Sequence, residues 1–245
     1  VFFSPEDLSI IKNGPAERRR FVDMELCQLD PVYLRDLNSY NKIVNQRNRL
    51  LKDMAFQPAL SGTLDIWDMQ LAGYAKRIIE RRSIFAQELN GIIQEVHASL
   101  SGGKEKLEVV YEPHVHAEEV EERMQKNRER DIRMKQTTTG PHRDDFAFVA
   151  NGIDIRRFGS QGQQRTAALS LKLSEIELVK RMTKDAPILL LDDVLSELDS
   201  NRQNYLLNSI GNIQTIVTCT GLDEFVNNRF EINRVFHVSQ GQISD

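Results

Sequence analysis

The stretch Pro187–Asp199, PILLLDDVLSELD, decides the fold. Its apolar run Ile188–Leu191 is short, follows a proline and ends in two adjacent carboxylates, Asp192 and Asp193. A run of this length predicts a strand buried on both faces of a parallel sheet. Ligands of such sheets bind outside the carboxyl ends of the strands, where one acid can hold Mg²⁺ and a second can orient and deprotonate a water. A core strand whose polar end happens to be acidic is the alternative.

A loop rich in glycine and glutamine, Phe158–Thr166 (FGSQGQQRT), lies upstream of this strand. Gly159 and Gly162 allow the backbone to bring amide groups close to a ligand, and the N-terminus of the helix that follows favours an anion. An ordinary helix cap formed by Ser160 is the alternative interpretation. The helix is expected to be amphipathic, and the residues on its inner side are Ala167, Leu171, Ser174 and Leu178.

The order of these features is more specific than either feature alone. A glycine-rich loop, a helix, a strand that ends in two acids and the segment Ser196–Asp199 follow one another without other elements between them. This order resembles the head of an ABC-type ATPase, with its signature loop, Walker B strand and D-loop. Such a head also needs a GxxxxGK[ST] loop for the phosphates, and residues 1–245 contain no such run. We therefore expect a fragment of a larger head, with a degenerate relative as the alternative.

Composition and charge indicate an ordinary globular protein. A chain of 245 residues is long enough for one large or two small domains. Since the formal net charge is −4, any DNA-binding surface must be a local patch. Cys27 and Cys219 show no metal or redox spacing, which favours a reducing cytosol. No apolar stretch approaches the ~20 residues that span a bilayer, so we expect a cytoplasmic protein without a membrane partner.

Two long segments carry an apolar pattern of the heptad type. In residues 31–54 the apolar side chains alternate in steps of four and three, with one interruption at Arg47. Residues 67–100 repeat the pattern, and there the interruption falls at Arg81 and Arg82. Because a short linker joins the segments, they predict an antiparallel helical hairpin. Helices of this length form a short arm of roughly 35–55 Å.

The fold class that we expect is α/β. Residues 1–25 and 136–245 form an incomplete ABC-type ATPase head with a mixed sheet flanked by helices, and residues 26–135 form an inserted, mainly helical arm. Ala117–Lys135 predicts one heavily charged helix, and Asn151-Gly152 predicts a hairpin turn. Further strands are expected at Leu107–Tyr111, at Thr215–Thr220, which should be buried, and at Val235–Val238, which should lie at an edge.

Several arginines are candidates for contact with DNA phosphates. Three of them follow one another on a predicted helix near the start of the chain, and the others lie along one flank of the arm. The candidates are Arg18, Arg19, Arg20, Arg47, Arg81 and Arg82. Acidic residues are interleaved with them, so solvated or ion-paired helix faces are the alternative.

Six stretches carry a more specific resemblance. They are FSPEDL (Phe3–Leu8), ERRRFVD (Glu17–Asp23), QRNRLLK (Gln46–Lys52), TGPHRDDF (Thr139–Phe146), FGSQGQQRTAALSLKL (Phe158–Leu173) and PILLLDDVLSELD (Pro187–Asp199). With these the chain resembles the RecF family, bacterial recombination-mediator ATPases related to SMC proteins. The resemblance implies an ATP-dependent homodimer that binds DNA at single-strand gaps and duplex junctions. It also implies that RecO and RecR act with the protein to help load the RecA recombinase.

The resemblance also implies roles for individual acids. Asp192 would hold Mg²⁺, and Asp193, where ABC-type heads usually have Glu, would be the general base. Ser196 and Asp199 would belong to the D-loop at the dimer interface. Thr220 stands approximately where many heads have a switch histidine, which is consistent with a weak, DNA-dependent ATPase of slow turnover.

The signature loop is implied to act on the partner's nucleotide. Ser160 and Gly162 would contact the γ-phosphate of ATP bound to the other protomer, and Gln161 and Gln163 would support the loop. Another short-armed SMC-like head is the alternative within the same chemistry. A module that binds DNA or protein without hydrolysing ATP is the alternative of a different class.

Overall fold

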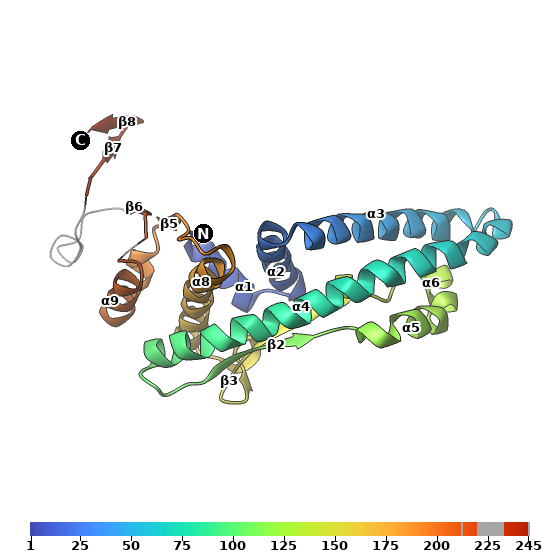
Figure 1. The fold of residues 1–245 in the computed structure, drawn as a ribbon, viewed down its shortest axis with the longest axis horizontal. Coiled ribbons are helices and arrows are strands. Elements are labelled where there is room, and N and C mark those ends of the chain that lie inside the picture. The colour runs from blue at the N-terminus through green and yellow to red at the C-terminus, as the bar shows by residue number, and fades with distance from the viewer. Residues whose placement is uncertain (212, 220–232, 245) are drawn as a thin grey trace. The chain divides into compact units, whose positions relative to one another are not determined.

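The structure is a computed structural model that describes residues 1–211, 213–219 and 233–244 (Figure 1). Its contacts form two compact units, one of residues 1–5 with 187–245 and one of residues 6–186. This division differs from the expected head and arm, because the larger unit joins the arm helices to the head elements that precede Pro187. The head and arm boundaries therefore stay a prediction.

The larger unit is mainly helical. Its helices are α1 (Leu8–Lys12), α2 (Pro15–Leu29), α3 (Pro31–Asp53), α4 (Leu64–Ser101), α5 (Val120–Lys126), α6 (Arg128–Met134), α7 (Ile155–Phe158) and α8 (Gln161–Thr183). Its strands are β2 (Leu107–Glu112), β3 (Asp145–Ala150) and β4 (Ile153–Asp154). None of the helices in the described part of the chain combines the length and the apolar character that a membrane crossing requires.

Helices α3 and α4 lie side by side in opposite directions, so the predicted helical hairpin is confirmed (Figure 1). The Asp30 side chain begins α3 by accepting hydrogen bonds from the backbone N–H groups of Val32 and Tyr33 at 2.9 and 3.1 Å. Helix α4 ends at Gly102, whose φ of +65° is the left-handed conformation that glycine adopts at helix ends. The seam between the helices buries Tyr40 of α3.

The core of this unit continues from α4 into α8. Helix α8 is not amphipathic as predicted, because every residue from Thr166 to Ile176 is buried. Helices α1 and α4 both pack against it, and a helix covered from several sides has no solvated stripe over the covered turns. Two of the residues that this burial includes are charged, Lys172 and Glu175.

The antiparallel sheet of this unit has the strand order β2-β3-β4. The predicted hairpin turn is confirmed: Asn151 and Gly152 have φ values of +49° and +80° between β3 and β4. The side chain of Asn90 on α4 holds the outer edge of β2. It accepts a hydrogen bond from Val109 N and donates one to Val109 O, both at 2.7 Å.

The charged segment Ala117–Lys135 is not one helix as predicted. A 3₁₀ turn precedes α5, and the helix is interrupted at Asn127 before α6 begins. The Asn127 side chain donates a hydrogen bond to Thr139 Oγ1 at 2.7 Å. After the break, Asp131 is fully buried and accepts hydrogen bonds from Thr138 N and Oγ1 at 3.0 and 2.5 Å. These polar contacts fix the direction of α6.

The smaller unit contains the predicted parallel sheet, with the order β1-β5-β6. Its elements are β1 (Phe2–Phe3), β5 (Leu189–Asp192), β6 (Thr215–Thr218), α9 (Ser200–Ser209), β7 (His237–Ser239) and β8 (Gln242–Ser244). The strand expected at Val235–Val238 is found two residues later as β7, which pairs with β8 in a hairpin.

The expectations that β5 is buried on both faces and that β6 is buried are wrong. Leu189 and Leu191 are 1% exposed, whereas Leu190, which points to the other face, is 39% exposed. Ile216 of β6 is 56% exposed. Burial in β5 therefore alternates with the period of two that side chains follow along a strand, whereas Ile216, Val217 and Thr218 of β6 are all exposed among the described residues.

Candidate functional site

Two acids lie at the carboxyl end of β5, where the sequence places them. The Thr218 hydroxyl at the end of β6 donates a hydrogen bond to Asp192 Oδ1 at 2.6 Å. The Asp193 backbone N–H donates to Thr218 O at 3.1 Å. Asp193 has a φ of +51°, a left-handed conformation that Asp tolerates better than most residues. The backbone therefore turns sharply directly after the strand and brings both acids to its end.

The two acids fit the ligands that Mg²⁺ prefers. Asp192 is exposed and Asp193 is half-buried, so both carboxylates remain accessible to a cation. Mg²⁺ is usually held by one or two carboxylates together with waters and phosphate oxygens. Across the described ranges, no group of three His, Cys, Asp or Glu side chains is arranged to hold a metal by itself. This pair is thus suited to a metal that arrives with phosphate.

The segment after β5 brings Ser196 to Asp193. The Ser196 hydroxyl lies 2.8 Å from Asp193 O and 3.1 Å from Asp193 Oδ1. Asp199 begins α9 as its N-cap and also forms an ion pair with Arg202. Sequence reasoning missed Thr218, whose position at the end of the neighbouring parallel strand is the signal that would have found it. Thr220, the predicted switch position, lies outside the described residues.

The signature loop ends in an ordinary helix cap formed by Ser160, as the alternative interpretation of its sequence predicts. Ser160 is the N-cap of α8: its hydroxyl accepts a hydrogen bond from Gln163 N at 3.2 Å, and Gln163 Oε1 accepts one from Ser160 N at 2.8 Å. The cap does not bury the loop, because Ser160, Gln161 and Gly162 are all exposed. The first amides of a 23-residue helix therefore face solvent beside a serine hydroxyl.

The two glycines of this loop have different structural reasons. A Cβ at Gly159 would lie 2.5 Å from the Ile155 carbonyl oxygen, so the fold itself requires glycine there. A Cβ at Gly162 would lie 3.8 Å from Ser160 Oγ, an ordinary van der Waals contact. Packing within the chain thus leaves room for a side chain at Gly162, although glycine in a helix costs about 1 kcal/mol relative to alanine.

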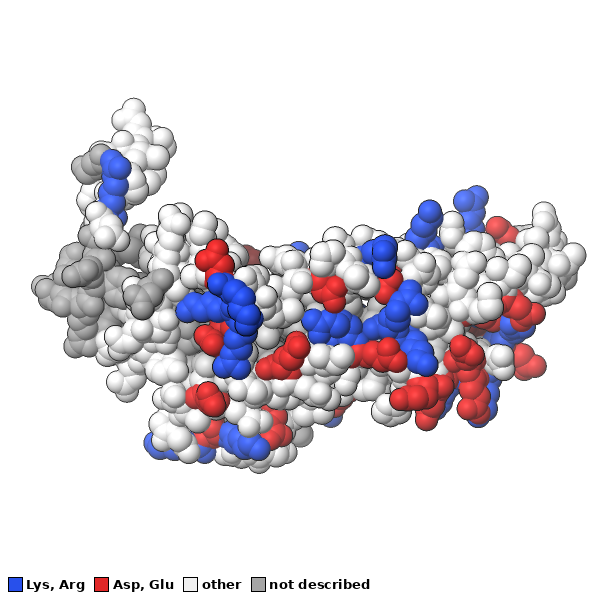
Figure 2. Space-filling view, viewed as in Figure 1, with Lys and Arg blue, Asp and Glu red and all other residues white. Residues whose placement is uncertain are grey.

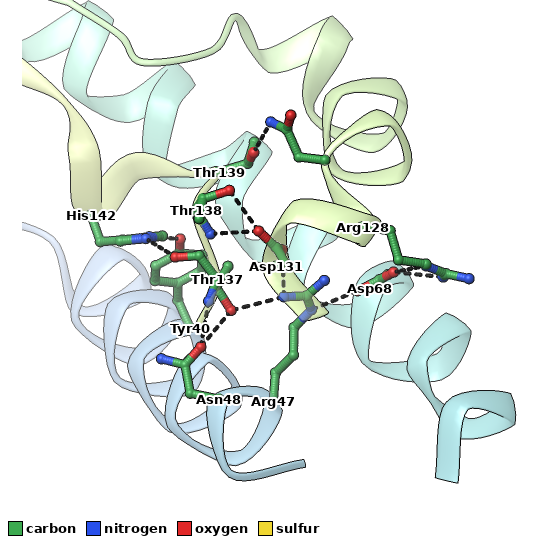
Figure 3. A network of polar contacts seen from close by, with 11 residues as sticks. Tyr40, Arg47, Asn48, Asp68, Arg128, Asp131, Thr137, Thr138, Thr139 and His142 are labelled. Carbon is green, nitrogen blue, oxygen red and sulfur yellow. Dashed lines mark hydrogen bonds and ion pairs between the residues drawn. The ribbon is translucent and has the colours of Figure 1, made fainter. Parts of the chain in front are cut away.

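Three of the arginines predicted to contact DNA are buried, and for them the prediction is wrong. They are Arg18, Arg47 and Arg82, which are 3%, 0% and 1% exposed. Arg47 pairs with Asp68 and Asp131, each at 2.7 Å (Figure 3). Arg18 forms a two-pronged pair with Asp145 at 2.7 and 2.9 Å. Charges in the interior are stable only with such partners, so these arginines hold the fold together.

Arg82 has the largest set of partners among these arginines. Its guanidinium donates hydrogen bonds to Asp23 at 2.8 Å, to Asp144 at 2.9 Å and to the Pro141 carbonyl oxygen at 2.7 Å. Its Nε also donates to Tyr33 Oη at 3.0 Å. Arg82 therefore ties α2, α3 and α4 to the segment that precedes β3.

The other three arginines remain at the surface to different degrees. Arg81 forms ion pairs with Asp30 at 3.0 Å and Glu88 at 3.5 Å. Arg19 and Arg20 line an open groove of about 500 Å³ between α2, α3 and the segment around His142. Burial lowers the pKa of His142 to about 4, so this side chain is neutral at pH 7. On the face seen in Figure 2, basic and acidic side chains are interspersed.

A buried charge cluster on α2 and α8 has a predictable pH dependence. Lys172 pairs with Glu175 at 2.5 Å, and burial followed by the charge of Glu175 raises the pKa of Glu25 to about 7. Because the folded state holds this proton more tightly, the ionised Glu25 destabilises the fold increasingly as the pH rises from about 4.5 to 7. We expect Glu25→Gln to raise the free energy of unfolding by up to about 3 kcal/mol at pH 8, and by much less at pH 5.

Urea unfolding of the two proteins at both pH values measures this effect. Glu17→Gln, a change on the same helix outside the cluster, is the control and should leave the pH dependence as it is. An equal effect of Glu25→Gln at pH 5 and pH 8 would show that Glu25 does not titrate between them.

The chain is similar over nearly its whole length to curated proteins that share one name. It is 63% identical over 243 residues to the DNA replication and repair protein RecF of Agathobacter rectalis, and the matched region covers 99% of this chain and 67% of that protein. The RecF of Lachnospira eligens is 62% identical over 245 residues, covering 99% of this chain and 68% of that protein. No family model matches the chain. The chain therefore spans about two thirds of the length of these relatives.

Solved structures show the same fold. The recombination mediator protein RecF-ATP of the RecFOR pathway superposes with a TM-score of 0.90 at 38% identity, over 100% of this chain and 66% of that one. The RecF-ATPrS structure of the same pathway gives a TM-score of 0.87 at 37% identity, over 99% of this chain and 66% of that one. The predicted α/β fold is thereby confirmed.

Proposed function

The chain belongs to the RecF family, and from this premise we propose that the protein is an ATP-dependent DNA-binding protein of recombinational repair. The relative solved as RecF-ATP supports ATP as the nucleotide, and its assignment to the RecFOR pathway supports RecO and RecR as partners. We propose single-strand gaps and duplex junctions as the DNA that it binds, and help in loading RecA as the result. We also propose that it acts in the cytoplasm.

The observation that carries this proposal is the exposed N-terminus of α8. Ser160, Gln161 and Gly162 are exposed, so the amides that begin the helix and the O–H of the capping serine can reach a phosphate. The chain has room for a side chain at Gly162, yet the residue there is glycine. This supports the close approach of a ligand from outside the chain. We propose that this ligand is the γ-phosphate of ATP held by a second protomer, with Gln163 fixing the loop.

The acid pair supplies the other half of the proposed chemistry. Asp192, oriented by the Thr218 hydroxyl, would hold Mg²⁺ bound to the ATP of its own protomer. Asp193 would orient the attacking water and accept its proton, and Ser196 keeps the Asp193 carboxylate in place. Residues 1–245 have no GxxxxGK[ST] run, so we propose that the phosphate-binding loop lies elsewhere in the complete protein. Hydrolysis would be slow and would release the dimer.

For DNA, the groove beside Arg19 and Arg20 is the surface that we propose. Arg20 is exposed, whereas Arg19 is half-buried and its Nη1 donates a hydrogen bond to the Asp144 carbonyl oxygen at 2.6 Å. Each can contact a phosphate without breaking a buried ion pair. Arg81 remains a weaker proposal because Asp30 and Glu88 already neutralise it.

Replacing Asp193 with Asn tests the catalytic part of the proposal. The amide cannot accept the water's proton, so we expect the ATP turnover of the complete protein to fall by about 10²–10⁴-fold. ATP binding should persist, because Asp192 remains. Asp185→Asn, at an exposed acid that precedes β5, is the matched control and should leave turnover unchanged. Undiminished turnover in Asp193→Asn would contradict the assigned role, and no turnover in the unchanged protein would favour the non-hydrolysing module.

A further inference from the structure

A chain of polar contacts connects the cap of α8 to the end of the long helix α4. Gln163 Nε2 donates a hydrogen bond to Glu105 Oε1 at 2.8 Å. The other carboxylate oxygen of Glu105 lies 3.2 Å from His97 Nε2, and His97 is fully buried. His97 Nδ1 in turn lies 2.8 Å from Ser170 Oγ on α8. Glu105 therefore lies between α8 and the last turns of α4.

Glu105 determines which way the Gln163 amide faces. The cap requires the oxygen of that amide to accept from Ser160 N, which leaves its NH₂ group to point elsewhere. Glu105 accepts a hydrogen bond from this NH₂ group, and a carboxylate acceptor makes the contact stronger than one between neutral groups. Without Glu105, the Gln163 side chain would lose the hydrogen bond that ties it to a residue outside the loop, and only the cap itself would hold it.

Glu105 itself is held firmly enough for this task. Its backbone N–H donates to Ser101 Oγ at 3.3 Å. Gly102 and Gly103, with φ values of +65° and +75°, form the tight turn that returns the chain from α4 toward β2. The Glu105 side chain is 21% exposed, so its carboxylate is partly shielded from water. These constraints place one carboxylate beside the cap of α8.

We propose that Glu105 is a positioning residue for the signature loop, which it holds through Gln163 in the geometry that receives the partner's ATP. This inference rests on the proposed function, because it assigns a task to a loop whose ligand is itself proposed. Glu105 acts through Gln163 and is assigned no contact with nucleotide or metal. Its effect is to keep the Ser160 hydroxyl and the first amides of α8 aligned before the second protomer arrives, which lowers the cost of ordering on binding.

The variants Glu105→Ala and Glu105→Gln test the proposal in the complete protein. Alanine removes the acceptor, whereas the glutamine oxygen can still accept from Gln163. With ATP and Mg²⁺, we expect Glu105→Ala to raise the dimer dissociation constant about tenfold, which corresponds to about 1.4 kcal/mol, and Glu105→Gln to restore most of the loss. ATP binding by the monomer should be unchanged in both variants. Glu108→Ala, in the next surface pair along the chain, is the control and should dimerise normally.

Amide hydrogen exchange supplies a readout that needs no nucleotide. We expect the amides of residues 161–164 to exchange faster in Glu105→Ala than in the unchanged protein, and Glu105→Gln to slow them again. Normal dimerisation by Glu105→Ala, or equal impairment of both variants, would overturn the inference alone. Failure of the unchanged protein to dimerise with ATP would instead overturn the proposed function, and the task given to Glu105 with it.

Discussion

Replacing Arg82 with Ala is expected to lower the free energy of unfolding by about 3–5 kcal/mol. The guanidinium is 1% exposed and contacts the carboxylates of Asp23 and Asp144 and the carbonyl oxygen of Pro141. Its removal would leave Asp144, which is fully buried, without its cationic partner. Most of the loss therefore comes from an uncompensated buried charge, and urea unfolding measures it directly.

A surface ion pair is the matched comparison. Arg123 pairs with Glu119 at 3.8 Å, and both side chains are about half exposed. Arg123→Ala should cost less than about 1 kcal/mol, because water replaces such a pair. If Arg82→Ala were no more destabilising than Arg123→Ala, and weakened DNA binding instead, Arg82 would belong to the DNA surface after all.

The helical arm was predictable because the spacing of its apolar residues is visible in the sequence without knowledge of what they pack against. The misjudged arginines of the arm, Arg47 and Arg82, interrupt that repeat, and they lie where the next apolar side chain is due. The position of these arginines on the seam therefore predicted their burial better than their charge predicted contact with DNA. A long side chain at a core position must be buried if the helices pack. What the pattern could not give was the partners, because Asp68 and Asp131 come from elements distant in the chain.

The candidate site was predictable to the extent that it is local in sequence. The cap of α8 and the two acids after β5 are each formed by residues that lie next to one another in a single short motif. Glu105 was missed because only the fold brings it to Gln163. Thr218 was missed although it ends a predicted strand, because its contact with Asp192 requires that strand to be the neighbour of β5. The one-sided burial of β5 was also beyond reach, because a run of four apolar residues looks the same whether one or both faces are covered.

The second large effect is expected at Ser160. Arginine there would place a long cationic side chain on the exposed N-terminus of α8, where we propose that the partner's ATP docks. We expect Ser160→Arg to abolish ATP-dependent dimerisation. Ser160→Ala separates this from the loss of the helix cap, because both variants lose the cap and should lose about 1 kcal/mol of stability. Alanine adds no bulk, so its dimer should be weakened and still form.

The central claim is that ATP joins two protomers through the signature loop, and sedimentation of the complete protein tests it most directly. We predict a monomer without nucleotide, a dimer with ATP and Mg²⁺, and a monomer under both conditions for Ser160→Arg. A protein that binds ATP and remains monomeric would contradict the account, as would a Ser160→Arg variant that dimerises as readily as the unchanged chain.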